Sequence, residues 1–165
     1  MNIGLLTISD RGASGEYEDR SGPLMAQLIA ENSSWTIGRR AVIPDDFETI
    51  VETLINWSAE RLDLILTSGG TGFAPRDITP EATRQVIDRE APGIAEGLRA
   101  ASFKITRHAM LSRGVAGMRG RTLIINLPGS PKAVRENLEL LLPILPHALE
   151  LLAATPGSES QHRSI

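Results

Sequence analysis

Three short segments of almost unbroken apolar character recur along the chain, at residues 3–9, 62–67 and 122–127. A strand that is apolar at consecutive positions, rather than at alternate ones, is typical of a sheet covered on both faces. Residues 35–43 alternate and are rich in β-forming side chains, which predicts a further strand. Amphipathic helical patterns separate these segments. The alternation predicts a single three-layer α/β/α domain with a mostly parallel central sheet.

Local signals predict where two of the helices begin. Asp45 and Glu48 have approximately the spacing of a capping box. Thr79 before Pro80 predicts a threonine cap followed by a proline in the first turn. We expect the helix that starts there to end near Glu90.

The stretch from residue 91 to residue 121 is harder to interpret. A helical pattern covers residues 94–105, and residues 106–121 show no clear period. Glycines at positions 114, 117 and 120 favour a loop or a hairpin in this second part.

The composition excludes several kinds of chemistry. The chain has 165 residues, of which 41% are hydrophobic, and this is enough for a core that needs no covalent or metal support. It contains no cysteine, which excludes disulfides, zinc ribbons, iron–sulfur clusters and thiol nucleophiles. We expect the domain over residues 1–155 and a polar, flexible tail over residues 156–165.

The charge balance also narrows the choice of partners. The formal net charge is −3, whereas proteins that bind nucleic acid or membrane surfaces are usually basic, so neither partner is expected. No apolar run reaches the roughly 18 residues that cross a bilayer. The first residues lack the features of a signal peptide. The sequence therefore predicts a cytoplasmic protein.

Three loops of small and polar residues follow the predicted apolar strands, at residues 9–12, 67–72 and 127–131. Ligands of open α/β sheets bind outside the carboxyl ends of the strands, so these loops are expected to line one pocket. The candidate binding residues in them are Ser9, Asp10, Ser68, Gly69, Gly70, Thr71, Gly72, Pro128, Gly129 and Ser130.

The loop at residues 69–72 contains three glycines in four positions. Glycine permits positive φ, so that successive N–H groups can point at one anion, and it lets phosphate oxygens approach the backbone closely. The alternative is a tight turn that binds nothing. Ser130 has two interpretations as well, because a serine at a helix start caps the helix and also marks an anion site.

Two aspartates follow predicted strands and are candidate ligands of a metal ion. Asp45 and Asp77 come from different strand ends, and two carboxylates of this kind can share a Mg²⁺ ion, which prefers oxygen ligands. The alternative for Asp45 is a helix cap. The alternatives for Asp77 are a cap or an ion pair with Arg76.

These segments occur together in an order that is specific for one family. They are TISDR at 7–11, IPD at 43–45, TSGGTG at 67–72, RDITPE at 76–81 and LPGSPKA at 127–133. Over about residues 2–153 the chain resembles the MogA-type molybdopterin adenylyltransferases, which are related to the G domain of gephyrin.

The resemblance implies an activity and the partners that go with it. In that family AMP is transferred from ATP to the terminal phosphate of molybdopterin, pyrophosphate is released, and Mg²⁺ is required. Members are typically homotrimers, and their product passes to a molybdate-insertion protein. The resemblance further implies catalytic and metal-binding roles for Asp45 and Asp77, a pterin-site role for Ser112, and substrate contacts from Ser9, Asp10 and the glycine loop.

Other functions stay open at this point. The CinA-type proteins and one domain of the MoeA-type insertases also look similar, but they are longer chains, which favours the stand-alone adenylyltransferase. A MoaB-type protein that binds molybdopterin without turning over ATP, and that acts as a scaffold for a partner, is the alternative from a different class.

Overall fold

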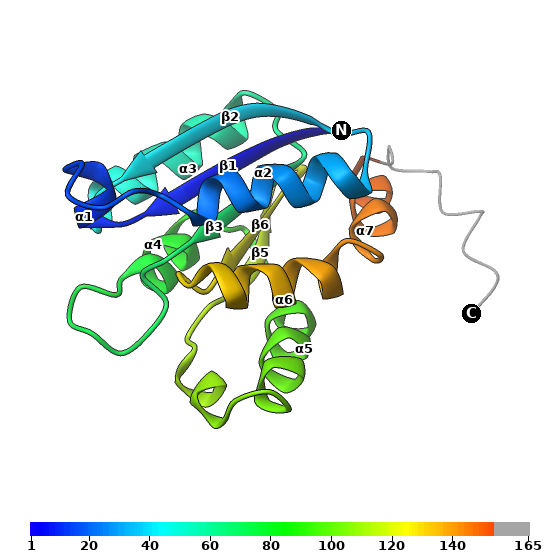
Figure 1. Cartoon of the computed structure of the whole chain (residues 1–165). Coiled ribbons are helices and arrows are strands. Elements are labelled where there is room, and N and C mark those ends of the chain that lie inside the picture. Colours follow the sequence, from blue (N-terminus) through cyan, green and yellow to red (C-terminus); the bar gives the residue numbers. More distant parts are fainter. Residues whose placement is uncertain (154–165) are drawn as a thin grey trace.

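The computed structural model describes residues 1–153, whose central feature is a six-stranded sheet (Figure 1). The strands are β1 Asn2–Ile8, β2 Thr36–Ile43, β3 Leu64–Ser68, β4 Arg89–Glu90, β5 Ala116–Arg119 and β6 Thr122–Leu127. They lie in the order β2-β1-β3-β6-β5-β4. The first four in this order are parallel, whereas β5 and β4 join in antiparallel fashion, so the predicted mostly parallel sheet is confirmed. The tail predicted for residues 156–165 lies outside the described residues.

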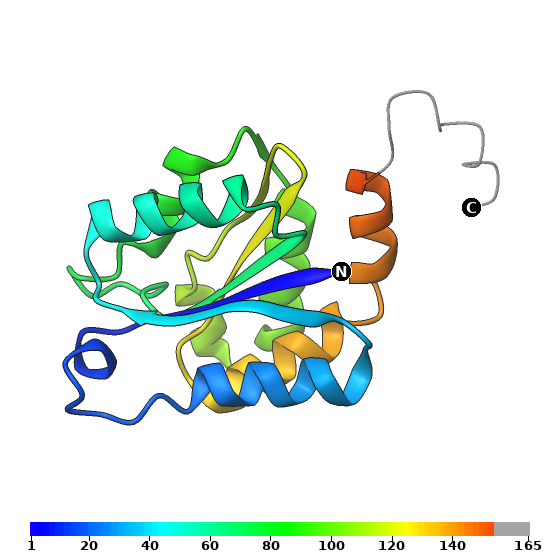
Figure 2. The same cartoon turned by 90° about the horizontal axis from the view of Figure 1, so that it is seen from above.

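Helices cover both faces of the sheet, as predicted (Figure 2). They are α1 Asp10–Ala13, α2 Ser21–Asn32, α3 Phe47–Ala59, α4 Thr79–Val86, α5 Pro92–Phe103, the short 3-10 helix η1 Arg107–Leu111, α6 Pro131–Leu141 and α7 Leu145–Ala153. Helices α2, α5, α6 and α7 pack on one face, and α3 and α4 pack on the other. None of the helices within residues 1–153 is long and apolar enough to cross a membrane.

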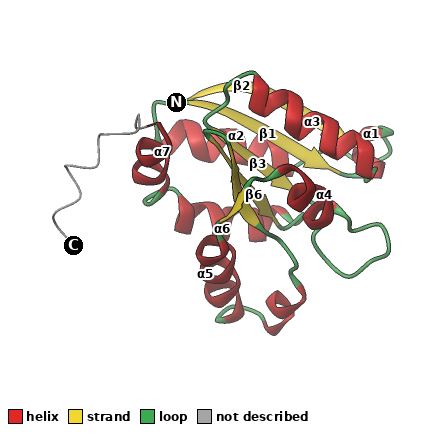
Figure 3. Ribbon diagram, turned by 180° about the vertical axis from the view of Figure 1, so that it is seen from behind, coloured by secondary structure: helices red, strands yellow, loops and turns green. Residues whose placement is uncertain are grey.

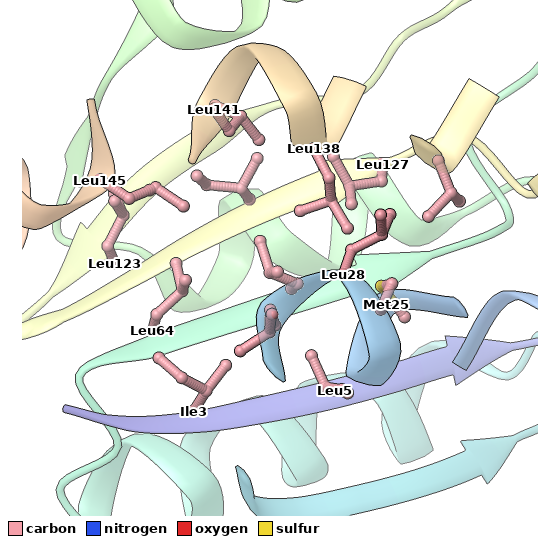
Figure 4. Packing of buried hydrophobic residues seen from close by; sticks show 14 of the residues in the cluster. Ile3, Leu5, Met25, Leu28, Leu64, Leu123, Leu127, Leu138, Leu141 and Leu145 are labelled. Atoms are coloured by element: carbon pink, nitrogen blue, oxygen red, sulfur yellow. The ribbon is translucent and has the colours of Figure 1, made fainter. Parts of the chain in front are cut away.

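Successive residues of the inner strands point to opposite faces of the sheet. On β3, Leu64 and Leu66 belong to the core under α2 and α6, and Ile65 belongs to the core under α3 and α4. All three are fully buried. Figure 4 shows the first of these cores, where side chains of β1, β3 and β6 meet those of α2 and α6. Burial on both faces explains the unbroken apolar runs of the sequence.

The carboxyl ends of β1, β3 and β6 lie at one edge of the sheet, and the loops that follow them meet there (Figure 3). The N–H group of Gly69 donates to the carbonyl of Leu127 at 3.3 Å. The hydroxyl of Ser68 donates to the carbonyl of Pro128 at 3.0 Å. The predicted meeting of these loops is therefore confirmed.

The start of α3 differs from the prediction by one residue. Asp46 is the cap, because its carboxylate accepts the N–H group of Thr49 at 2.9 Å and the hydroxyl of the same residue at 2.6 Å. The expected capping box of Asp45 and Glu48 is wrong. The backbone leaves β2 in a direction that places the second of two adjacent aspartates over the helix end, so Asp45 is not used as a cap.

The predicted threonine cap of α4 is also wrong. Thr79 is the first residue of the helix, and Ile78 occupies the cap position without a side-chain hydrogen bond. The hydroxyl of Thr79 is buried and has no hydrogen-bond partner among the described residues. The chain satisfies this helix start through the backbone instead, since the N–H group of Thr79 donates to the carbonyl of Gly70 at 3.1 Å.

The region at residues 91–121, which the sequence left ambiguous, contributes to the lateral side of the sheet at which β4 is the outermost strand. Helix α4 ends at Val86, earlier than expected, because the following residues enter strand β4 and pair with β5. Helix α5 begins at Pro92. Strands β5 and β6 then form the hairpin that the glycines favoured, with Gly120 in its turn at a φ of 54°.

The glycine turn after β3 generates a stability prediction. Gly69 has a φ of 109°, and a Cβ atom on it would lie 2.1 Å from the carbonyl oxygen of Ile8. We expect Gly69→Ala to lower the free energy of unfolding by about 1–3 kcal/mol from backbone strain alone. Gly97, which is exposed in α5 and has nothing within 4 Å of such an atom, is the control. There the change to Ala should raise stability by roughly 0.5–1 kcal/mol. Urea unfolding measures both, and equal effects would contradict the close approach.

Candidate functional site

Two hollows open where β1, β3 and β6 end, and the turn after β3 borders both. The β1-side hollow has a volume of about 330 Å³. Its lining includes Ser9, Asp19, Ser68, Gly69, Gly129 and Ser130. The α5-side hollow has a volume of about 260 Å³. Its lining includes Thr71, Gly72, Arg99, His108, Ser112 and Pro128. The structure thus groups most of the predicted binding residues around two cavities, while Asp10, Asp45, Gly70 and Asp77 line neither.

The turn between the hollows depends on backbone conformations that favour glycine. Gly69 and Gly70 both have positive φ, at 109° and 62°. A Cβ atom on Gly70 would lie 2.3 Å from the hydroxyl oxygen of Thr79 and 3.0 Å from Oδ1 of Asp45. The bare backbone of the turn therefore lies directly against one of the two candidate metal ligands.

Asp45 and Asp10 hold the ends of β2 and β1 together by a reciprocal pair of hydrogen bonds. The N–H group of Asp10 donates to Oδ2 of Asp45 at 3.0 Å, and the N–H group of Asp45 donates to Oδ1 of Asp10 at 3.0 Å. The other oxygen of Asp10 pairs with the guanidinium group of Arg76 at 2.5 Å. The arrangement fixes two carboxylates from different strands in one place.

The environment of Asp45 disfavours its charge. Burial raises the pKa of the Asp45 carboxyl above its ordinary value, and the negative charges of Asp10 and Asp77 raise this pKa further. The N–H group of Asp10 and the cation of Arg76 act in the opposite direction. The net shift of the pKa is upward, and since the charges of Asp10 and Asp77 contribute to it, a cation bound beside them would favour the charged form of Asp45.

Asp77 lies beyond the glycine turn, on the loop that leads into α4. Its Oδ2 atom accepts the N–H group of Ala74 at 2.8 Å. The two alternative roles that the sequence left open are both wrong, because α4 has no side-chain cap and Arg76 pairs with Asp10 instead. The carboxylate of Asp77 also faces the turn, since a Cβ atom on Gly72 would lie 2.8 Å from Oδ2.

These residues fit a Mg²⁺ ion that is held only in part by protein. No group of three or more acidic or histidine side chains within residues 1–153 is arranged to hold a metal by itself. Mg²⁺ usually takes one or two carboxylates and completes its shell with water and substrate phosphates. Asp45 and Asp77 can supply the carboxylates. The hydroxyl of Thr79 has no hydrogen-bond partner among the described residues and lies close to Gly70, where a Cβ atom would be 2.3 Å from its oxygen.

Ser112 lies at the end of η1 and lines the α5-side hollow. Sequence reasoning missed the other polar side chains of this hollow, which include those of Arg99, Ser102, Thr106, His108, Glu136 and Asn137. The spacing of Leu98, Arg99 and Ser102 on α5 was a usable signal, because these residues share one helix face. Nothing local in the sequence pointed to His108. Ser130 caps α6 through the N–H group of Ala133 at 3.3 Å, so its capping interpretation is confirmed.

The neighbouring residues Asp45 and Asp46 should respond to pH with opposite signs. The pKa of Asp45 is raised in the folded chain, so ionisation of this carboxyl costs more in the folded than in the unfolded state. The free energy of unfolding therefore falls as the pH rises above 3.8, and the full loss is reached at neutral pH. The pKa of Asp46 is lowered by its hydrogen bonds to Thr49, so its contribution is present above 3.8 and is lost on acidification. We therefore expect Asp45→Asn to stabilise the ligand-free chain at about pH 7 and Asp46→Asn to destabilise it. Unfolding curves of both variants between about pH 3.8 and pH 7 test this prediction. Changes of the same sign in the free energy of unfolding at neutral pH would contradict it.

Comparison with known proteins connects this geometry to a family. The family described as "Probable molybdopterin binding domain" matches residues 4–147. Gephyrin from Dictyostelium discoideum is 43% identical over 173 residues, which cover 98% of this chain and 24% of gephyrin. The chain spans about a quarter of that relative and of the protein cinnamon from Drosophila melanogaster.

Two relatives match over most of their own length. A molybdopterin adenylyltransferase from Helicobacter pylori is 42% identical over 154 residues, which cover 92% of this chain and 88% of the relative. The crystal structure of the molybdopterin biosynthesis enzyme MoaB from Thermus thermophilus superposes with a TM-score of 0.87 at 51% identity, and the match covers 94% of this chain and 98% of that one. The chain therefore belongs to the family described as probable molybdopterin binding domains.

Proposed function

We propose that this protein is a molybdopterin adenylyltransferase, which transfers AMP from ATP to the terminal phosphate of molybdopterin. The observation that carries the proposal is the pair of hollows on either side of one glycine turn. A transferase for two substrates needs two binding sites that meet at the reacting atoms. The adenylyltransferase name of the Helicobacter pylori relative supports the same reaction.

The lining of each hollow suits one of the two substrates. The α5-side hollow combines the apolar side chains Leu98 and Leu111 with the polar groups of Ser112 and Asn137, which suits a flat ring system with donors and acceptors. We assign it to the pterin. The β1-side hollow contains the half-exposed ring of Tyr17, which suits the nucleotide.

Cations near that ring support the assignment of the nucleotide. The guanidinium carbons of Arg11 and Arg20 lie 5.5 Å and 5.8 Å from the centre of the Tyr17 ring. Both arginines line the β1-side hollow. An aromatic face beside two cations can take a base and its phosphates together.

The reaction needs positioning more than proton transfer. An oxygen of the terminal phosphate of molybdopterin attacks the α-phosphorus of ATP and forms a new P–O bond. The bond from this phosphorus to the oxygen that leads to the β-phosphate breaks, and pyrophosphate leaves with the bonding electrons. A phosphate monoester is already ionised near neutral pH, so no side chain has to act as a general base.

The side chains of the site are therefore assigned to holding and aligning the phosphates. The N–H groups of the turn beyond Gly69 would bind phosphate oxygens without a mobile charge, since the N–H group of Gly69 itself donates to the carbonyl of Leu127. Asp45 and Asp77 would hold Mg²⁺, with Asp10 beside them. When bound, Mg²⁺ would neutralise charge on the phosphates of ATP and on the leaving pyrophosphate.

We further propose that the chain works in the cytoplasm as a homotrimer and passes its product to a molybdate-insertion protein. Apolar side chains exposed beside the α5-side hollow support an interface in this region. Phe103, Ile105 and Met110 are 47%, 55% and 70% exposed. Exposed apolar groups that cluster on one side of a domain often mark a contact with another chain.

The direct test of the activity is release of pyrophosphate from ATP. We expect release that requires molybdopterin and that stops when EDTA removes divalent cations. Molybdopterin alone, ATP alone and the EDTA-treated mixture are the controls. Continued release in EDTA would contradict the role of the metal.

A molybdopterin-binding protein without turnover is the second candidate. Binding of molybdopterin with no pyrophosphate in the complete mixture would favour this candidate over the enzyme.

Asp77→Asn should separate binding from transfer. The amide oxygen of Asn can still accept the N–H group of Ala74, so the change removes mainly the charge. We expect the rate of AMP transfer to fall by about 100-fold, because a misaligned phosphate has losses of this size. Pterin affinity should change little. Asp88→Asn is the matched control, since Asp88 accepts the N–H group of Gly120 at 2.7 Å on the far edge of the sheet. Equal losses of pterin affinity and of rate would contradict a metal-binding role.

A further inference from the structure

Arg113 has no role in the proposed reaction so far, yet it donates four hydrogen bonds to the loops and the helix around the site. Its Nε atom donates to the carbonyl of Gly72 at 2.7 Å. Its two terminal nitrogens donate to the carbonyl of Asp77 and to the carboxylate of Glu81. Its own N–H group donates to the carbonyl of Thr71 at 2.9 Å. One residue thus contacts the turn after β3, the loop that follows it and the first turn of α4.

These contacts close the loop over residues 72–77 at both of its ends. The loop has no apolar anchor, since Phe73 is 68% exposed and the next three residues are exposed as well. Within the loop, Asp77 and Ala74 exchange two hydrogen bonds of 2.8 Å. The position of the Asp77 carboxylate therefore depends on a short turn whose two ends are joined by one guanidinium group.

Arg113 also connects this loop to the other side of the site. It directly follows Ser112, which lines the α5-side hollow. The hydrogen bond from the Arg113 backbone to Thr71 fixes this segment against the glycine turn. The side chain and the backbone of one residue therefore set the distance between Asp77 and Ser112.

We propose that Arg113 is a positioning residue that keeps the carboxylate of Asp77 and the hydroxyl of Ser112 in register, so that the metal-bound nucleotide and the pterin phosphate meet in line. This inference rests on the proposed function. In this inference the positioning role of Arg113 depends on the shape of its side chain and not on its charge. Glu81 already neutralises that charge, and three of the five guanidinium N–H groups are used inside the protein.

The test is Arg113→Lys, which keeps the charge but cannot reach three acceptors in one plane. We expect the maximal rate of pyrophosphate release to fall by about 100-fold, because alignment of the reacting groups is lost. The KM values for ATP and molybdopterin should stay within roughly threefold, because neither hollow loses a contact. Arg84→Lys is the matched control, since Arg84 lies on α4 and pairs with Glu90 at 3.5 Å on the surface. It should behave like wild type.

A second measurement does not depend on activity. Hydrogen exchange of backbone amides should become faster over residues 72–77 and over residues 109–115 in Arg113→Lys, and should stay unchanged in the core strand β3. The variant Glu81→Gln keeps both carbonyl acceptors of Arg113, so its rate should stay close to that of wild type.

The outcomes separate this inference from the proposed function. A wild-type rate in Arg113→Lys would show that charge suffices and would overturn the positioning role. A slow variant with unchanged hydrogen exchange would overturn it too, because the arginine would then act on substrate directly. A slow Glu81→Gln variant would likewise point to charge. Absence of turnover in wild type would contradict the proposed function, whereas the exchange measurement would still decide whether Arg113 holds the two segments.

Discussion

The close approach of three strand ends governs the rest of the site. A Cβ atom on Gly69 would lie 2.1 Å from the carbonyl oxygen of Ile8, and one on Gly129 would lie 3.3 Å from Cα of Gly69. No side chain fits between these backbones, so the turn after β3 packs directly against the ends of β1 and β6. Cavities on its two sides are consequently near neighbours, although different helices line them. In the proposed reaction the two substrates would bind in these cavities and meet beside the turn.

A cluster of acidic side chains is the second property of this end of the sheet. The reciprocal hydrogen bonds of Asp10 and Asp45 tie two acidic side chains to the ends of β1 and β2. Burial raises the pKa of Asp45 and the negative charges of Asp10 and Asp77 raise it further, although the N–H group of Asp10 lowers it. A fold that accepts this cost in the ligand-free state is typical of functional sites, where perturbed groups are held ready for a ligand.

The sequence predicted the sheet and the meeting of its loops because both follow from local patterns. Continuous apolar runs identify inner strands, and parallel strands must end at a common edge. It did not distinguish Asp45 from Asp46 as the cap of α3, because a shift of one residue leaves the spacing almost unchanged while it reverses which side chain reaches the helix end. The network of Arg113 was not predictable at all. The partners of its side chain lie 32 to 41 residues away along the chain, and no local sequence pattern reflects such contacts.

The pairing of the cations nearest to Asp45 and Asp77 favours the divalent cation of the proposed reaction. Arg76 is paired with Asp10, and Arg113 is paired with Glu81 and with two carbonyls. Neither guanidinium group is available to neutralise phosphates unless it gives up an acidic partner, and that would leave a further carboxylate uncompensated. Two anionic substrates must nevertheless come together beside Asp45 and Asp77. In the proposed reaction the compensation then falls to Arg11 and Arg20 of the β1-side hollow, to backbone N–H groups of the glycine turn and to a divalent cation, which adds positive charge without breaking either ion pair.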